Sequence, residues 1–298
     1  MNINNVTIAG AGLLGSQVAW QVAFSGFEVT VYDYFEKGLT SSKALHKEYS
    51  ELFVSTRGAS QEQVDEALAR LKYTSDLSEA VKDADLINES IPESVEIKQS
   101  FYKELSKLAP QKTIFTSNSS TLVPSQIVDS TDRPEKFLAL HFGNTVWDSR
   151  IGEVMGHPTT CPEVYKVICQ FSKAMGMVTI PLHKEQSGYI INAIMIPWLN
   201  ASLDLVVNGV ADFESVDKTW MLAHNVERGP FAVMDIVGIS LVADINKLWG
   251  EELDDAAALA RANFLDKHDV SQNKLGEKGQ EGFYSYPNPA YRDANFIR

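Results

Sequence analysis

Cysteine is scarce in this sequence, with only Cys161 and Cys169 in 298 residues. Both lie in a stretch with a helical pattern, and eight residues at about 1.5 Å rise each separate them too far for a disulfide. Neither belongs to a C-x-x-C pair, so the cysteines predict no metal or redox motif. We therefore expect two reduced thiols in a cytoplasmic protein.

Basic residues are also few. The chain has 26 Lys and Arg against 39 Asp and Glu, a formal net charge of −13. Such a surface repels nucleic-acid phosphates and anionic lipid headgroups, so we expect neither nucleic acid nor membrane as a partner. The histidines other than His141 have no ligand-like spacing, so no metal site is predicted; they are His46, His157, His183, His224 and His268.

Long uninterrupted hydrophobic runs are missing as well. The longest apolar stretch, 189–207, is interrupted by Asn192, Asn200, Ser202 and Asp204. A membrane span needs about 20 residues with few polar ones, so this stretch is interpreted as an amphipathic helix. Residues 1–10 lack the basic start and long apolar core of a secretion signal, and we expect them to begin the first strand.

A glycine motif follows the first apolar run. Residues 3–9 are rich in Ile, Val and Thr, and Gly10, Gly12 and Gly15 then follow in the spacing G-x-G-x-x-G. A helical pattern comes next, and a second apolar run, 27–32, ends at Asp33. This order predicts a parallel strand, helix, strand unit of about 30 residues.

That unit is typical of a dinucleotide site. Gly10 permits the tight bend, Gly12 lets the main chain approach a pyrophosphate, and Gly15 allows close helix packing. Leu13 and Leu14 belong to the helix start, whose N–H groups attract anions. Asp33, 18 residues past the last glycine, can accept hydrogen bonds from the ribose hydroxyls and repels a 2′-phosphate, which favours NAD over NADP. From this motif alone FAD is also possible.

Strand and helix patterns then alternate. We expect helices within 35–70, 93–108 and 163–175, and strands at 84–91, 113–117, 136–142, 151–155 and 177–180. From Gly188 onward only helical patterns occur, around 188–208, 215–224, 231–249 and 253–265. The predicted fold is α/β, a doubly wound, mostly parallel Rossmann-type sheet with an all-helical C-terminal domain. We place the NAD-binding domain at 1–185 and a substrate and dimerisation domain at 186–298.

His141 and Glu153 form a second candidate pair. The histidine ends an apolar strand, and the carboxyl edge of a parallel sheet faces the ligand crevice. Glu153 lies in the next apolar segment, which can return beside it. A carboxylate at one imidazole nitrogen fixes the tautomer while the other nitrogen takes a hydroxyl proton, as in alcohol oxidation. A capped structural histidine and a surface glutamate are an equally good interpretation of the spacing.

Other polar groups can be read in two ways. Ser117, Asn118, Ser119 and Ser120 follow a strand, where they can hold a substrate oxygen or simply form a turn. Asn192 sits in the apolar stretch, where a buried amide needs partners. It could reach a ligand across the domain crevice or cap its own helix near Gly188.

At these residues the chain resembles the L-3-hydroxyacyl-CoA dehydrogenase family, and is 3-hydroxybutyryl-CoA dehydrogenase-like over nearly its whole length. The similarity extends beyond the glycine turn through several motifs in the same order. The matching segments are Asn88-Glu89-Ser90-Ile91-Pro92-Glu93 with Lys98, Ser117-Asn118-Ser119-Ser120, His141-Phe142-Gly143-Asn144 with Glu153, Gly188-Tyr189-Ile190-Ile191-Asn192, Gly229-Pro230-Phe231 with Asp235, and Glu281-Gly282-Phe283-Tyr284.

The resemblance implies an NAD-dependent dehydrogenase of fatty acid metabolism that oxidises a short-chain L-3-hydroxyacyl-CoA to the 3-oxoacyl-CoA, and the reverse. It implies His141 as catalytic base, Glu153 as its orienting partner, and Ser120, Asn144 and Asn192 as groups that position the substrate. The cofactor-binding residues are then Gly10, Gly12, Leu13, Leu14, Gly15, Asp33, Glu93, Lys98 and Asn118. Members of the family are dimeric through the C-terminal helices, which implies a homodimer.

The sequence departs from the family pattern at Gly143, Thr145 and Ala193. In addition, the family carries several lysines toward the CoA phosphates, whereas residues 49–63 here contain only Arg57 as a cation. Anionic phosphates need cationic partners, so two alternatives remain. One is the same chemistry on a CoA-free 3-hydroxy acid, such as a sugar acid or a carnitine-like compound. The other is a non-catalytic NAD-binding relative, like the lens crystallin that shares this fold.

Overall fold

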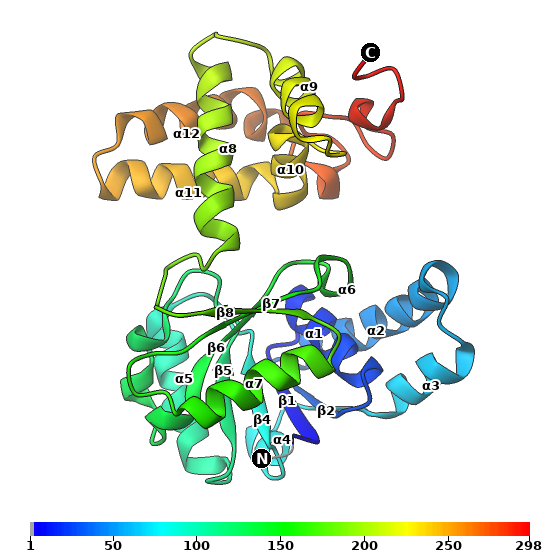
Figure 1. Ribbon diagram of the computed structural model, residues 1–298, viewed down its shortest axis with the longest axis vertical. Coiled ribbons are helices and arrows are strands. Elements are labelled where there is room, and N and C mark those ends of the chain that lie inside the picture. Colours follow the sequence, from blue (N-terminus) through cyan, green and yellow to red (C-terminus); the bar gives the residue numbers. More distant parts are fainter. Residues whose placement is uncertain (1–2) are drawn as a thin grey trace. The chain divides into compact units, whose positions relative to one another are not determined.

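A single eight-stranded sheet organises the N-terminal two thirds of the chain. The computed structural model describes residues 3–298, and its strands lie in the order β3-β2-β1-β4-β5-β6-β7-β8 (Figure 1). All neighbouring strands pair in parallel except β6 and β7, which are antiparallel. The sequence prediction of a doubly wound, mostly parallel sheet is confirmed.

The strands are short, and their bounds are β1 Asn5–Ala9, β2 Glu28–Tyr32, β3 Leu71–Thr74, β4 Leu86–Glu89, β5 Ile114–Ser117, β6 Phe137–Phe142, β7 Ile151–Met155 and β8 Val178–Leu182. The helices around them are α1 Leu13–Phe24, α2 Glu36–Arg57, α3 Gln61–Ala69, α4 Leu77–Val81, α5 Val95–Leu108, α6 Val146–Ser149 and α7 Pro162–Ala174. Strand and helix alternate along the chain, and the crossovers place helices on both faces of the sheet.

Alternate strand residues supply the two cores that these helices cover. Val6, Ile8 and Leu86 pack in one core with α1, α2, α3 and α7. Their neighbours Ile87 and Phe115 belong to the other core, with α4 and α5. This is the period of two expected for a strand covered on both faces.

The sequence prediction lacks three short elements, namely β3, α4 and the four-residue helix α6. Strand β3 and helix α4 both lie within 71–81, to which the sequence patterns assign no element. The segment is only four residues of mixed polarity followed by one helical turn, and β3 pairs on one side only, with β2. An edge strand needs no continuous apolar run, so its pattern is weak.

The C-terminal unit is helical. Residues up to Asn192 form one compact unit and Ala193–Arg298 form a second. The helices from residue 191 onward are α8 Ile191–Val207, α9 Phe213–His224, α10 Pro230–Val237, α11 Ile239–Glu252 and α12 Ala256–His268.

The prediction of one helix over 231–249 is wrong, because Gly238, with φ 103°, separates α10 from α11. That φ lies outside the helical region, which ends α10.

Two buried aspartates hold the turns of the helical unit. Asp217 accepts hydrogen bonds from the main-chain N–H groups of Phe231 (2.8 Å) and Ala232 (3.0 Å) at the start of α10. Asp235 accepts from those of Phe283 and Tyr284, both at 2.9 Å. The segments that contain Gly229 and Gly282 thus pack directly against these carboxylates. A Cβ on Gly229 would lie 2.4 Å from the carboxyl carbon of Asp217, and a Cβ on Gly282 would lie 2.1 Å from Oδ1 of Asp235.

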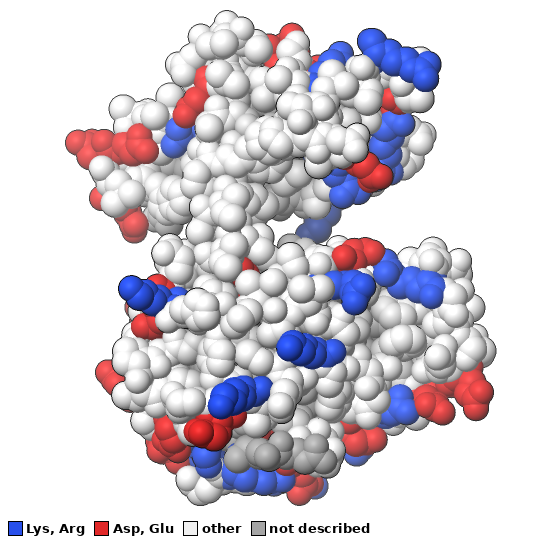
Figure 2. Space-filling view, viewed as in Figure 1, with Lys and Arg blue, Asp and Glu red and all other residues white. Residues whose placement is uncertain are grey.

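Acidic and basic side chains are interspersed on the face drawn in Figure 2, without a continuous basic stripe among the described residues. Within residues 3–298 no helix has both the length and the apolar character needed to cross a membrane. The same part of the chain contains no group of three or more His, Cys, Asp or Glu side chains able to hold a metal ion.

Candidate active site

The glycine turn lies where β1 ends. Gly10 has φ 106°, and a Cβ there would meet the carbonyl oxygen of Ser90 at 2.4 Å. A Cβ on Gly15 would meet the carbonyl of Gly10 at 2.0 Å, whereas one on Gly12 would meet nothing within 4 Å. Two glycines are therefore required by packing, and the third leaves open space in front of the turn.

That open space faces the start of α1. Gly12 caps this helix without a side-chain hydrogen bond, and the first turn contains no acidic residue. The N–H groups of Leu13 and Leu14 are among those that a helix start leaves without an intrahelical acceptor. Such a start attracts an anion through these donors and the helix dipole, so the turn fits a pyrophosphate group.

Asp33 lies at the end of β2 beside the turn. Its Oδ2 accepts the N–H of Ala11 at 2.8 Å and its Oδ1 accepts the N–H of Phe35 at 2.9 Å. These contacts fix the carboxylate next to the glycine turn, and each oxygen has a further lone pair for a ribose hydroxyl. The side chain is only partly buried, so it is accessible to a ligand.

A cleft of about 860 Å³ continues from the glycine turn past Asp33. Its walls include Gly10, Gly12 and Asp33, and also apolar side chains that the sequence reasoning missed: Tyr32, Tyr34, Phe35, Ile91, Ile97 and Phe101. Ile97 and Phe101 are four residues apart on α5 and so share a face of that helix. This spacing was the available signal in the sequence, but two apolar residues on one face of a helix usually indicate packing against the core. The cleft fits the planar adenine and ribose of a dinucleotide.

His141 and Glu153 are directly opposite each other. They are register partners in the antiparallel pair β6 and β7, which brings their side chains to the same face. Nδ1 of His141 lies 2.9 Å from Oε2 of Glu153, and both side chains are almost fully buried. Nε2 of His141 makes no hydrogen bond to residues 3–298. The arrangement holds the ring by one nitrogen and leaves the other for a ligand.

Glu153 also fixes the entry to α8. Its Oε1 accepts the N–H groups of Ile190 (2.8 Å) and Ile191 (3.1 Å), at the N-terminus of that helix. The adjacent Tyr189 is fully buried, and its ring stacks on His141 at a centroid distance of 4.6 Å. Sequence reasoning did not single out Tyr189. One carboxylate thus locates both the histidine and the segment that covers it.

Asn118 joins the ends of three strands. Its Nδ2 donates to Oγ of Ser90 at 3.0 Å, and its Oδ1 accepts the N–H of Phe142 at 2.9 Å. Ser90 follows β4, Asn118 follows β5, and Phe142 is next to His141 on β6. The amide therefore ties the histidine strand to the segment beside the glycine turn.

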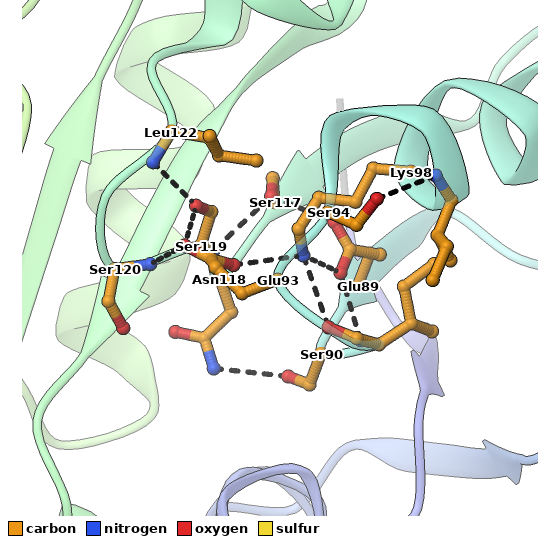
Figure 3. A network of polar contacts seen from close by, with 12 residues as sticks. Glu89, Ser90, Glu93, Ser94, Lys98, Ser117, Asn118, Ser119, Ser120 and Leu122 are labelled. Atoms are coloured by element: carbon orange, nitrogen blue, oxygen red, sulfur yellow. Dashed lines mark hydrogen bonds and ion pairs between the residues drawn. The ribbon is translucent and has the colours of Figure 1, made fainter. Parts of the chain in front are cut away.

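Glu93 holds the following loop through one oxygen. Its Oε1 accepts the Ser119 hydroxyl at 2.5 Å, the N–H groups of Ser120 and Thr121 at 3.0 Å each, and the Thr121 hydroxyl at 2.9 Å. Its other oxygen lies 3.4 Å from Nζ of Lys98. Figure 3 shows the carboxylate between the loop and the lysine. Burial alone would raise the pKa of Glu93, but the Ser119 donor, the Lys98 charge and the Thr121 donors hold it below its usual value.

The remaining substrate candidates lie at the same edge of the sheet. Ser120 is partly exposed, and its carbonyl accepts Nδ2 of Asn192 at 3.4 Å. Asn192 also donates its main-chain N–H to Gly188, so it belongs to the first turn of α8. Asn144 is exposed in the loop after β6. Lys98, which the resemblance implies as a cofactor-binding residue, is by contrast buried, with 1% of its surface exposed.

Comparison with known proteins places both units in one family. Residues 5–186 match the model of the 3-hydroxyacyl-CoA dehydrogenase NAD binding domain, and residues 188–286 match that of the C-terminal domain. The human mitochondrial hydroxyacyl-coenzyme A dehydrogenase is 32% identical over 95% of this chain and 91% of its own. A probable 3-hydroxybutyryl-CoA dehydrogenase of Deinococcus radiodurans is 29% identical over 94% of this chain and 99% of its own.

Solved structures show the same similarity. A diketoreductase described as catalysing reactions of dicarbonyl compounds has a TM-score of 0.90 and 42% identity, covering 96% of this chain and 100% of its own. Mycobacterium tuberculosis FadB2 has a TM-score of 0.87 and 27% identity, with the same coverage of both chains.

Proposed function

Because the chain belongs to the 3-hydroxyacyl-CoA dehydrogenase family of NAD-dependent oxidoreductases, we propose that His141 is the general base and acid of its reaction and that Glu153 is its orienting partner. The observation that carries the proposal is the buried 2.9 Å contact between His141 Nδ1 and Glu153, while Nε2 makes no hydrogen bond within residues 3–298. A carboxylate so placed keeps the proton on Nδ1, which makes Nε2 the acceptor.

In the oxidation direction, Nε2 of His141 takes the proton of the 3-hydroxyl, and Glu153 stabilises the imidazolium that forms. In the reduction direction the imidazolium returns this proton to the carbonyl oxygen. Ser120, Asn144 and Asn192 hold the reacting oxygen and the neighbouring carbonyl. NAD, when bound, supplies the hydride acceptor, and the cofactor residues are the glycine turn with Leu13, Leu14 and Asp33, flanked by Glu93 and Asn118.

The leading substrate is a short-chain L-3-hydroxyacyl-CoA. A second candidate is a CoA-free 3-hydroxy acid or dicarbonyl compound, which the similarity to the diketoreductase favours. A structural observation supports it: Arg57, the cation of 49–63, forms an ion pair with Asp148. The Asp148 charge offsets that of Arg57, which weakens its attraction for a phosphate.

A substrate panel tests both candidates. NADH oxidation is measured with acetoacetyl-CoA, free acetoacetate and a CoA-free 1,3-dicarbonyl under the same conditions. A kcat/KM for acetoacetyl-CoA well above those of the free compounds supports the thioester. The reverse order assigns a CoA-free substrate, and no turnover of any compound would reject the enzymatic role of His141.

We further propose that 1–185 binds the cofactor and that 186–298 contributes to substrate binding and to a homodimer in the cytoplasm. Exposed large apolar side chains on the helical unit support the dimer, with Ile194, Leu241 and Leu253 exposed by 66%, 52% and 71%. Sedimentation equilibrium tests it, because a monomer at micromolar concentration contradicts the proposal.

A further inference from the structure

The short loop between β6 and β7 carries Asn144 and has a strained main chain. Thr145, the next residue, has φ 55°, in the left-handed region that β-branched residues rarely adopt. The loop ends at Arg150, with φ 49°, and the single helical turn α6 lies between these two residues. Such a conformation persists only where the surrounding structure holds it, so other elements must fix the loop.

The side chain of Gln17 supplies one such contact. Its Oε1 accepts the main-chain N–H of Thr145 at 2.8 Å and, more weakly, that of Val146 at 3.4 Å. These two N–H groups lie at the start of α6, where a helix provides no acceptor of its own. Thr145 caps the turn without a side-chain hydrogen bond. The amide oxygen of Gln17 therefore takes the place of a cap.

Gln17 belongs to the helix that begins at the glycine turn. It lies on α1, two residues after Gly15, and its exposed fraction is 7%. On the other side of Asn144, the N–H of Phe142 donates to Oδ1 of Asn118 at 2.9 Å. Asn144 thus lies between two main-chain positions, and a side-chain amide from a different part of the chain holds each of them.

The later part of the turn is held from α2 instead. The ring of Trp147 packs against the rings of Tyr49 and Phe53, with centroid distances of 4.7 and 5.4 Å. Both partners belong to α2, and Trp147 is buried among them. Loss of the Gln17 contact should therefore leave this anchor in place and loosen the part of the loop that carries Asn144.

We propose that Gln17 is a positioning residue, which acts through the main chain of Thr145 to hold Asn144 toward the substrate. Helix α1 then has two tasks, because its first turn attracts the pyrophosphate group and its next turn fixes the substrate loop. This inference rests on the proposed role of Asn144, but its structural part concerns only the loop and can be measured without turnover.

Amide hydrogen exchange tests the hold on the loop. Gln17→Met keeps the length of the side chain and removes the acceptor, so exchange at the amides of Thr145 and Val146 is expected to become about tenfold faster or more. Gln21→Met is the matched control. Gln21 lies one turn further along α1, is 8% exposed, and donates to the carbonyl of Met175 at 2.7 Å. This variant is expected to leave exchange at the two loop amides unchanged.

Steady-state kinetics separate positioning from a general loss of structure. In Gln17→Met, KM for the best carbonyl substrate of the panel is expected to rise about tenfold, while KM for NADH stays within about twofold of the parent value. Gln21→Met is expected to change neither constant. An equal rise of the substrate KM in both variants, or unchanged exchange at Thr145 and Val146 in Gln17→Met, would overturn the proposal.

Two further measurements cover a failure of Gln17→Met to fold. Gln17→Glu retains an acceptor oxygen and is expected to keep exchange at Thr145 and Val146 slow. In the parent protein, the Thr145 amide is expected to exchange at least about tenfold more slowly than in an unstructured peptide, and fast exchange there would reject the role of Gln17. If no compound is turned over at all, the proposed function fails, while the exchange rates still decide whether Gln17 holds the loop.

Discussion

Buried carboxylates occur in both compact units, but their partners differ. At the edge of the sheet, Glu153 contacts His141 and Glu89 contacts Lys98, so each carboxylate is paired with a group that is or can be positively charged. In the helical unit, Asp217 and Asp235 accept main-chain N–H and tyrosine hydroxyl donors instead.

The difference is consistent with two tasks. A carboxylate beside a titratable ring can support a proton transfer, because the charge of the ring changes during the reaction. A carboxylate that gathers N–H donors satisfies a helix start or a turn, and no charge needs to move. Substitutions in the first group should therefore reduce activity, and those in the second should reduce stability.

The largest expected effect comes from His141→Gln, which cannot take up the hydroxyl proton. We expect kcat to fall about 10³-fold, while the NADH dissociation constant stays unchanged. Steady-state assays with the best substrate of the panel and NADH fluorescence titration measure the two quantities. His183→Gln, at an exposed position, is the control. A fully active His141→Gln variant would contradict the proposal that the carboxylates at the sheet edge support proton transfer while those of the helical unit only support stability.

Asp217→Asn tests the structural group. The amide can accept one of the two main-chain N–H groups at the start of α10 but presents a donor to the other. We expect the free energy of unfolding at pH 7 to fall by about 2 kcal/mol, the cost of one unsatisfied buried donor, with kcat unchanged for the folded protein. Urea denaturation measures the change. Normal stability combined with lost activity would contradict the proposed division of tasks.

Two glycine variants test the proposed role of the glycine turn at the sheet edge as the pyrophosphate site. Gly12→Ala adds a methyl group where nothing lies within 4 Å, whereas Gly15→Ala adds one that would lie 2.0 Å from the Gly10 carbonyl. The first variant should retain its melting temperature but bind NADH about tenfold more weakly, because the methyl occupies the space of the pyrophosphate. The second should lose stability. Equal NADH affinity of Gly12→Ala and the parent protein would contradict the assignment of the turn.

The smallest expected effect is a pH dependence. Burial raises the pKa of Asp217 from 3.8 to about 6. The folded state therefore binds more protons than the unfolded state between these values, and stability increases as the pH falls through the folded pKa. Between pH 7 and pH 5 this group should add about 1 kcal/mol to the free energy of unfolding. To isolate this contribution, the free energy of unfolding is measured against pH for the parent protein and for Asp217→Asn. The two curves should differ in slope between pH 7 and pH 5, and equal slopes would refute the prediction.

Local pattern was sufficient for much of the fold. The βαβ unit with its glycine turn, the strand at 151–155 and the all-helical C-terminal region each have a periodicity that neighbouring residues alone produce. The ordered motifs also identified the family and NAD, which the comparisons confirm. Short or interrupted elements were lost: β3 and α4 are too brief for a period, and the break at Gly238 lies inside a continuous apolar pattern.

The sequence by itself determined the order of the longer strands and helices and the kinds of side chain at their ends, because both follow from residue type and near-neighbour spacing. Only the tertiary structure decided which of these side chains meet. Glu153 faces His141 because β7 runs antiparallel to β6, and Lys98 reaches Glu89 because α5 packs beside the end of β4. Such contacts depend on the direction and register of segments distant in the chain, and no local pattern encodes either.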